Sequence, residues 1–258
     1  MSIIVEDLSV SLKNNLILKN ITLVIEPGEL LSVIGPNGSG KSTLMKTIVG
    51  DITPDAGSIT YANMPLENIN YRERARIRSV MSQSPSILYD FSVLDIIEMG
   101  WLNNKIEMDP EGFSSALKFV VSECKLADLT SRKYNSLSGG EQRRVHLART
   151  LIQLHNDKNN SFSGKYMFFD EPTANLDIAY EINMLKIIRK RASEGFGVLI
   201  NLHNLEMAYN FSDKIAMLDQ GRLIKFGKPE SVFDNKLLSQ VYGIKIRFDK
   251  NIKKIKVL

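Results

Sequence analysis

The sequence has only one cysteine, Cys124, and it has no apolar run long enough to cross a bilayer. A single cysteine excludes an internal disulfide bond, which agrees with a reducing compartment, and we expect Cys124 to be a buried structural thiol. The longest apolar runs, such as residues 166–169 and 197–200, fall far below the ~20 residues that a membrane-spanning helix requires. Runs of this length are typical of buried parallel strands.

The start of the chain also lacks the basic region and apolar stretch of a secretory signal, so no signal peptide is expected. A strong charge imbalance is absent as well, because the net charge of the 258 residues is only +4. Much of this excess lies in the tail at residues 244–256, where basic and apolar residues alternate. The alternation favours an edge strand with a solvated face, and contact with anionic lipid or nucleic acid is the alternative.

Strand-like and helix-like segments alternate along the chain, which predicts an α/β fold with a mostly parallel sheet and an antiparallel strand region. We expect one domain over residues 1–258, with its core formed by residues 1–83 and 165–258. Residues 84–154 lose the strand signals and gain helical periodicity, as at 93–99 and 115–121, which predicts an inserted α-helical subdomain. The polar segment at residues 155–164 is typical of a surface loop.

A glycine-rich segment near the start matches the phosphate-binding pattern G-x-x-x-x-G-K-[ST], known as the P-loop. Its glycines let backbone N–H groups turn toward phosphate oxygens, while the lysine reaches the terminal phosphates. Residues 30–34 predict a buried strand before the motif, and residues 42–48 predict a helix whose N-terminal dipole faces the phosphates. The residues expected to bind the nucleotide are Gly35, Pro36, Asn37, Gly38, Ser39, Gly40, Lys41, Ser42 and Thr43.

An apolar segment at residues 166–169 ends in two acids, Asp170 and Glu171. In P-loop NTPases an aspartate at such a strand end holds Mg²⁺ together with the P-loop hydroxyl, here that of Ser42. Mg²⁺ prefers hard oxygen ligands and keeps several waters, so these two side chains and phosphate oxygens suffice. Glu171 is then available to orient or deprotonate the attacking water. An Asp-Glu pair alone is more often a helix cap or a turn, so this prediction depends on the other motifs.

A second glycine-rich motif, Leu-Ser-Gly-Gly-Glu-Gln, occupies residues 137–142. A stray Ser-Gly-Gly is normally a loop or a helix N-cap, and the periodicity that follows predicts that Ser138 starts a helix. The Ser138 hydroxyl and the amides of Gly139 and Gly140 would then form a second anion site at a helix N-terminus. One chain cannot use both anion sites on one ATP, which predicts a nucleotide held between two copies.

With these motifs the chain resembles the ATP-binding-cassette (ABC) ATPases over essentially its full length. The resemblance implies an ATPase that uses ATP and Mg²⁺ and works as a head-to-tail homodimer, in which the signature motif at 137–142 closes on the other protomer's nucleotide. It also implies roles for single residues. Gln83 matches the Q-loop glutamine that touches Mg²⁺ or the attacking water, Asp177 matches the D-loop aspartate within 175–177, and His203 matches the switch histidine at the γ-phosphate. The other two histidines, His146 and His155, are interpreted as ordinary helix-surface or loop residues.

One position departs from the family pattern. Most relatives stack an aromatic residue on adenine, and the corresponding residue here is Leu12. Base selectivity is then loose, or it comes from a neighbour such as Ile17 or from another residue. Stacking is worth about 1 kcal/mol.

The resemblance further implies that residues 84–93 receive a coupling helix from a transmembrane permease. Apolar exposure there would form a docking groove, and the alternative is that Ile87 and Leu88 simply pack inside. The implied assembly contains two permease subunits and, indirectly, a substrate-binding protein, and it places this chain peripherally on the cytoplasmic face of the bacterial inner membrane.

Residues 78–83 and 91–100, with the polar insertion near residue 160, look most like the ATPases of bacterial heme importers. The broader group handles ferric siderophores, heme and cobalamin, so these cargoes remain alternatives. A soluble ABC ATPase of iron–sulfur assembly is a further alternative, and it would bind a soluble scaffold. A regulator acting on nucleic acid would carry paired cassettes or a strong basic patch. Neither is found in the sequence, so no nucleic-acid partner is expected.

Overall fold

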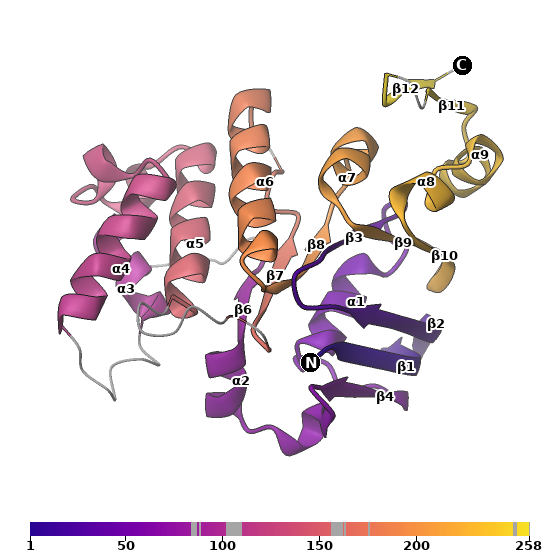
Figure 1. Ribbon diagram of the computed structural model, residues 1–258, viewed down its shortest axis with the longest axis horizontal. Coiled ribbons are helices and arrows are strands. Elements are labelled where there is room, and N and C mark those ends of the chain that lie inside the picture. Colours follow the sequence, from indigo (N-terminus) through magenta and orange to yellow (C-terminus); the bar gives the residue numbers. More distant parts are fainter. Residues whose placement is uncertain are drawn as a thin grey trace.

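The computed structural model describes residues 1–83, 87, 89–101, 110–155, 162, 164–174, 176–249 and 252–257. Two sheets lie next to each other, and a group of helices lies beside one edge of the larger sheet (Figure 1). Within these ranges no helix is both long and apolar enough to span a membrane.

The larger sheet has six strands in the order β10-β9-β3-β8-β7-β6. The strands are β3 (Leu30–Ile34), β6 (Arg78–Met81), β7 (Tyr166–Asp170), β8 (Gly197–Asn201), β9 (Lys214–Asp219) and β10 (Arg222–Gly227). All neighbours pair in parallel except β10, which pairs antiparallel with β9. Every residue of β3, β7 and β8 is buried, because both faces of the sheet are covered, as their apolar runs predicted.

The smaller sheet is antiparallel, in the order β2-β1-β4-β5. Its strands are β1 (Ile3–Leu12), β2 (Asn15–Ile25), β4 (Ala56–Tyr61) and β5 (Met64–Pro65). One buried cluster joins this sheet to α1 (Lys41–Ile48) and to Phe168 and Leu199 of the larger sheet. The next residues, Phe169 and Ile200, join a second cluster with the helices on the opposite face. This alternation along each strand divides the core into two layers.

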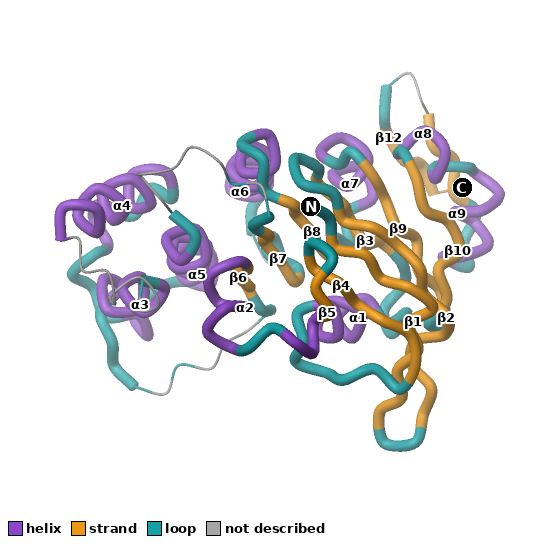
Figure 2. The backbone as a smooth tube through the Cα atoms, turned by 60° about the horizontal axis from the view of Figure 1, so that its bottom comes forward, coloured by secondary structure: helices purple, strands orange, loops and turns teal. Residues whose placement is uncertain are grey.

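The remaining helices are α2 (Tyr71–Ile77), α3 (Val93–Gly100), α4 (Pro110–Glu123), α5 (Gly139–Gln153), α6 (Ile178–Ser193), α7 (Leu205–Phe211), α8 (Pro229–Val232) and α9 (Asn235–Tyr242). Helices α3, α4 and α5 lie together beside β6 (Figure 2). Helices α3 and α5 approach closely, since a Cβ on Gly100 would lie 2.3 Å from the Arg149 carbonyl oxygen. Cys124, next to α4, is buried as predicted, and burial raises the pKa of its thiol.

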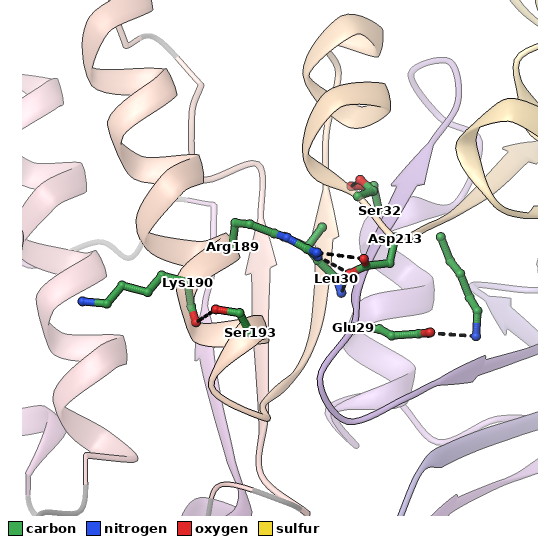
Figure 3. A network of polar contacts seen from close by, with 9 residues as sticks. Glu29, Leu30, Ser32, Arg189, Lys190, Ser193 and Asp213 are labelled. Atoms are coloured by element: carbon green, nitrogen blue, oxygen red, sulfur yellow. Dashed lines mark hydrogen bonds and ion pairs between the residues drawn. The ribbon is translucent and has the colours of Figure 1, made fainter. Parts of the chain in front are cut away.

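A polar network fixes the start of β3, the strand that leads into the P-loop (Figure 3). Asp213 accepts a hydrogen bond of 2.8 Å from the Leu30 backbone N–H, and its carboxylate also pairs with the Arg189 guanidinium from α6. Beside it, Lys214 pairs with Glu29 at 2.8 Å. Charged side chains thus connect α6 and β9 to the first residues of β3.

The basic tail forms a hairpin of its own, β11 (Ile246–Asp249) with β12 (Lys254–Val257), next to α9 (Figure 1). Ile246 and Phe248 are buried, and Phe248 packs on the Tyr209 ring. Arg247 is exposed. The predicted solvated basic face is therefore present, and the prediction of an edge strand is confirmed, because β11 and β12 form a two-stranded sheet in which each strand is an edge.

Candidate functional site

The P-loop connects the end of β3 to α1, and its backbone requires glycine. Gly35, Gly38 and Gly40 have φ angles of 148°, 79° and 104°, a region that residues with a side chain rarely adopt. A Cβ on Gly35 would lie 2.1 Å from the Leu218 carbonyl oxygen, and one on Gly40 would lie 2.7 Å from Leu18. The loop is thus shaped by both dihedral angles and close packing, with α1 starting directly after it.

Lys41, the first residue of α1, folds back over the P-loop. Its Nζ donates hydrogen bonds to the carbonyl oxygens of Gly35 and Pro36, at 2.8 and 3.0 Å. Burial lowers the pKa of Lys41, and the nearby Glu171 and Asp170 carboxylates oppose that shift. Phosphate oxygens would offer this ammonium charged acceptors in place of neutral carbonyls, which adds attraction between opposite charges to the hydrogen bonds.

A hydroxyl and a carboxylate meet beside the loop. Ser42 Oγ donates to Asp170 Oδ1 at 3.1 Å, and the Asn201 amide donates to the same oxygen at 2.7 Å. Asp170 and Asn201 face each other in the register of β7 and β8, so the contact is fixed by strand pairing. The buried Asn201 Oδ1 has no hydrogen-bond partner among the residues that the structure describes. Sequence reasoning missed Asn201, although its place at the end of a strand parallel to β7 was the signal.

Three more side chains meet at the same edge of the sheet. Gln83 Nε2 donates to Glu171 Oε2 at 2.6 Å, and His203 Nε2 lies 2.5 Å from Glu171 Oε1. Gln83 follows β6, Glu171 follows β7 and His203 follows β8, so neighbouring parallel strands deliver all three. Glu171 has a φ of +50°, a strained conformation for a residue with a side chain, of the kind that occurs at functional sites. The structure thus brings together the three residues expected to act in catalysis.

Arg143 of α5 is a further charged residue at this edge, and the motifs gave no specific signal for it. Burial lowers the pKa of Arg143, whereas Tyr134, Glu171 and Asp170 oppose that shift. The helix that begins at the second glycine-rich motif therefore places a cation near Asp170, which ends β7, and near Glu171, which follows it.

That motif forms the N-terminus of α5, as predicted. Ser138 is the N-cap, and its Oγ accepts a hydrogen bond of 3.3 Å from the Glu141 N–H, while Glu141 accepts from both Ser138 N and Oγ at 2.8 Å. These bonds lower the pKa of Glu141. Ser138 and Gly139 are exposed, and a Cβ on Gly139 would meet none of the described residues within 4 Å. Packing against the described part of the chain therefore does not explain a glycine at position 139.

The two anion sites belong to different parts of the molecule. The P-loop precedes α1 in the two-sheet region, whereas Ser138 lies on α5 among the helices beside β6 (Figures 1 and 2). Asp177 lies on neither, because it is the exposed N-cap of α6, where its carboxylate accepts from the Tyr180 N–H at 2.9 Å. Its neighbour Leu176 lies close to Gly140. Asn175 lies outside the described residues.

The interpretation of His146 as a helix-surface residue was wrong. Its side chain is buried, with 5% exposure, and Nε2 lies 2.7 Å from the Tyr134 hydroxyl. Burial lowers the pKa of His146 to about 4, and Arg149 and Arg143 contribute further lowering. This face of α5 packs against β6, where Gln153 donates to the backbone of that strand.

Two further expectations concern exposed apolar residues. Leu12 is 39% exposed at the end of β1, and Ile17 on β2 packs partly against the core. Ile87 also packs partly against the core, whereas Leu88 and residues 84–86 lie outside the described part of the chain.

Comparison with known proteins identifies relatives over nearly the whole chain. The family model described as "ABC transporter" matches residues 18–174. The hemin import ATP-binding protein HmuV of Thermobifida fusca is 36% identical over 233 residues, covering 89% of this chain and 78% of that protein. The protein of the same name from Escherichia coli O157:H7 is 34% identical over 242 residues, covering 93% and 92%.

Solved structures show the same fold. An ATP-binding subunit of an ABC transporter superposes with a TM-score of 0.78 at 21% identity, covering 95% of each chain. The structure of cbiO1 from Clostridium perfringens, described as part of the ABC transporter complex cbiONQ, gives a TM-score of 0.76 at 25% identity, covering 92% of each chain. MJ1267, an ATP-binding cassette of an ABC transporter, gives 0.79 at 23% identity, covering 93% of this chain and 98% of its own.

Proposed function

Since this chain belongs to the ABC transporter family of ATP-binding proteins, we propose that it is the ATP-hydrolysing subunit of a hemin importer. The hemin assignment rests on relatives that are named for hemin import and aligned over most of both chains. A ferric siderophore or cobalamin importer and a soluble ATPase of iron–sulfur assembly are the alternative functions. The ATPase proposal rests on one observation: Gln83 and His203 both contact Glu171, which lies beside the P-loop lysine.

We assign the phosphates of ATP to the P-loop. Its backbone amides and the N-terminus of α1 favour negative charge, and the Lys41 ammonium lies inside the loop. The γ-phosphate then lies near the ends of β6, β7 and β8, where the acids and the switch histidine gather. The Leu12 position supplies only an aliphatic contact for the base.

The residues present suit Mg²⁺. Ser42 and Asp170 offer a hydroxyl and a carboxylate oxygen 3.1 Å apart, and Mg²⁺ prefers such hard donors. Among the residues that the structure describes, no group of three or more His, Cys, Asp or Glu could hold a metal ion, so phosphate oxygens and water would supply the remaining ligands. Bound there, Mg²⁺ would neutralise charge that develops on the phosphates. The amide oxygen of Gln83 is the further ligand atom that the sequence suggested.

Glu171 is the residue we assign to the attacking water. Gln83 and His203 each contact one of its two carboxylate oxygens and so restrict its orientation. A positioned carboxylate that accepts the water proton as the water attacks the γ-phosphorus accelerates the reaction by about 10²–10⁴-fold. When ATP is bound, His203 turns from Glu171 toward the γ-phosphate in our proposal.

The second anion site acts on the nucleotide of another copy. Ser138 and Gly139 are exposed, and no described residue packs closely enough against position 139 to require a glycine there. In a head-to-tail homodimer this helix N-terminus caps the γ-phosphate held by the other P-loop, and Asp177 lies at the same interface. ATP binding closes the dimer, and hydrolysis reopens it.

The segment after Gln83 is the proposed docking site for the coupling helix of a permease subunit, and the proposed assembly contains two such subunits, with a substrate-binding protein as an indirect partner. The chain then works peripherally on the cytoplasmic face of a bacterial inner membrane. We expect no nucleic-acid partner.

The test uses the Glu171→Gln variant, which should bind ATP and remain closed. The variant is purified with ATP from native membranes, and the integral membrane proteins that accompany it are identified. The matched control is the Lys41→Ala, Glu171→Gln double variant, which should not hold ATP. A multi-span permease whose vesicles take up hemin supports the proposal. A soluble iron–sulfur scaffold without a permease would overturn the transport function, and a variant that stays monomeric in saturating ATP and Mg²⁺ would overturn the composite site.

A further inference from the structure

Tyr134, four positions before Ser138 of the signature motif, connects the segment around Phe91 to helix α5. Its backbone N–H donates to the Phe91 carbonyl at 2.9 Å, and its own carbonyl accepts from Gln142 Nε2 at 3.3 Å. Its hydroxyl lies 2.7 Å from His146 Nε2. Tyr134 therefore contacts the segment after the Q-loop with its backbone, and α5 with both its carbonyl and its side chain.

Residues 89–94 are here called the docking segment, because they overlap the proposed docking site at residues 84–93 and lie within the described part of the chain. They are bound along their length to residues 130–135. Backbone bonds run from Val93 N to the Arg132 carbonyl at 2.9 Å and from Leu94 N to the Thr130 carbonyl at 3.2 Å. Lys133 Nζ donates to the Asp90 carbonyl at 2.9 Å. A displacement of the docking segment must therefore move residues 130–135, which lead directly into the signature motif.

The Tyr134–His146 contact is buried and uncharged. Each residue is 5% exposed, and their rings meet edge to face at 5.4 Å. Burial raises the pKa of Tyr134 and lowers that of His146 to about 4, so both groups are neutral near pH 7. We assign the hydroxyl as the donor to Nε2, which leaves the ring proton on Nδ1. A buried bond of this kind is not weakened by solvent, and losing one partner leaves the other unsatisfied.

Helix α5 is also held at its other end. Gln153 Nε2 donates to the carbonyl oxygens of Ala75 and Arg78 at 2.9 Å each, which joins the C-terminus of α5 to the start of β6. Force applied near Tyr134 therefore reaches a helix that is anchored at Gln153. Such a helix responds by tilting its N-terminus, where Ser138 and Gly139 lie.

We propose that the Tyr134–His146 hydrogen bond is the positioning link that transmits movement of the docking segment to the signature helix α5. This inference rests on the proposed function, because it assigns the docking segment to a permease. Tyr134 and His146 act through α5 and not on the nucleotide. Without the link, the Tyr134 side chain no longer holds α5, and only the Gln142 bond and the chain itself connect the two, so less of the movement of the docking segment reaches the helix.

The test compares ATP turnover of the isolated protein with that of the purified permease complex in liposomes. Tyr134→Phe removes only the hydroxyl, and His146→Leu removes the acceptor, whereas His146→Gln keeps an acceptor. Tyr61→Phe is the matched control, because Tyr61 is also buried and its hydroxyl donates to the Ile48 carbonyl at 3.0 Å, away from the docking segment.

We expect isolated turnover to stay within about twofold of wild type in all four variants. Stimulation by the permease should fall at least about fivefold in Tyr134→Phe and His146→Leu, the lower end of typical coupling between sites. The His146→Gln variant should recover part of the stimulation, and Tyr61→Phe should keep all of it.

Full stimulation in Tyr134→Phe overturns this inference and leaves the proposed function standing. An equal loss of isolated turnover also overturns it, because the bond would then serve folding and not transmission. If no permease accompanies or stimulates the wild-type protein, the proposed function fails and this inference fails with it.

Discussion

Acidification should destabilise the protein through His146, and a variant without an ionisable group at this position should escape the effect. In the folded protein the imidazole is buried against Tyr134, with Arg143 and Arg149 nearby, and its pKa is lowered from 6.5 to about 4. In the unfolded chain the same side chain takes up a proton near pH 6.5. The contribution of His146 to stability is therefore complete above pH 6.5 and is lost progressively as the pH falls to about 4.

The magnitude follows from the size of the pKa shift. One pKa unit corresponds to 1.36 kcal/mol, so the shift from 6.5 to about 4 amounts to roughly 3 kcal/mol at low pH. At pH 7.5 the His146→Gln variant should be less stable than wild type by about 1 kcal/mol, the usual net value of a hydrogen bond. As the pH falls, the two free energies of unfolding should converge and then cross.

The single tryptophan, Trp101, supplies the signal. It ends α3, and its ring lies 5.6 Å from that of Phe113 on α4, so its fluorescence reports on the helices around His146. Urea titrations of wild type and His146→Gln at several values between pH 7.5 and 4 give the difference in unfolding free energy. Curves that stay parallel across this range would refute the reasoning, because other acids titrate equally in both proteins.

Three further predictions concern the P-loop and the ion pairs of α6. Lys41→Ala should lose both ATP binding and turnover, measured by calorimetry and phosphate release, and unchanged hydrolysis would disprove the P-loop assignment. Gly35→Ala should lower the thermal midpoint and abolish ATP binding, because its methyl group would lie 2.1 Å from the Leu218 carbonyl oxygen, whereas Gly139→Ala should fold normally. Glu123→Gln should cost about 1.5 kcal/mol in denaturant titrations, because Arg191 loses one charged acceptor at 2.9 Å but keeps the Glu194 carboxylate, also at 2.9 Å. A loss of unfolding free energy below 0.5 kcal/mol, the usual range of a surface substitution, would contradict the prediction that the Glu123–Arg191 pair stabilises the fold.

The elements that could be predicted from sequence carry strong local signals. The apolar runs of β3, β7 and β8 and the glycines of the P-loop are such cases, because burial on two faces and positive φ angles restrict residue type. The apolar run before Asp170 and Glu171 also correctly predicted that these two acids lie at the C-terminal end of a strand. The fold class and the family followed from these motifs, and the comparisons confirm both.

Contacts that depend on strand order or helix rotation could not be predicted in the same way. Asn201 reaches Asp170 only because β8 pairs with β7 in one register. His146 stands between arginines in a helix whose polar residues suggest a solvated surface, yet that face packs against β6. The tail alternates like an edge strand, but the sequence does not say which strand it pairs with.

The hydrogen bonds of Lys41 to its own loop bear on how a nucleotide arrives. The ammonium already has two acceptors at 2.8 and 3.0 Å, and the loop glycines are already in their left-handed conformations. When a nucleotide enters, the Lys41 ammonium therefore exchanges two carbonyl acceptors for phosphate oxygens, and the P-loop does not have to fold around the phosphates. Little ordering entropy is lost in such an exchange, so the heat-capacity change of ATP capture by a single protomer stays small. In the proposed head-to-tail dimer, the large ordering cost would fall later, when two protomers meet across the bound phosphates.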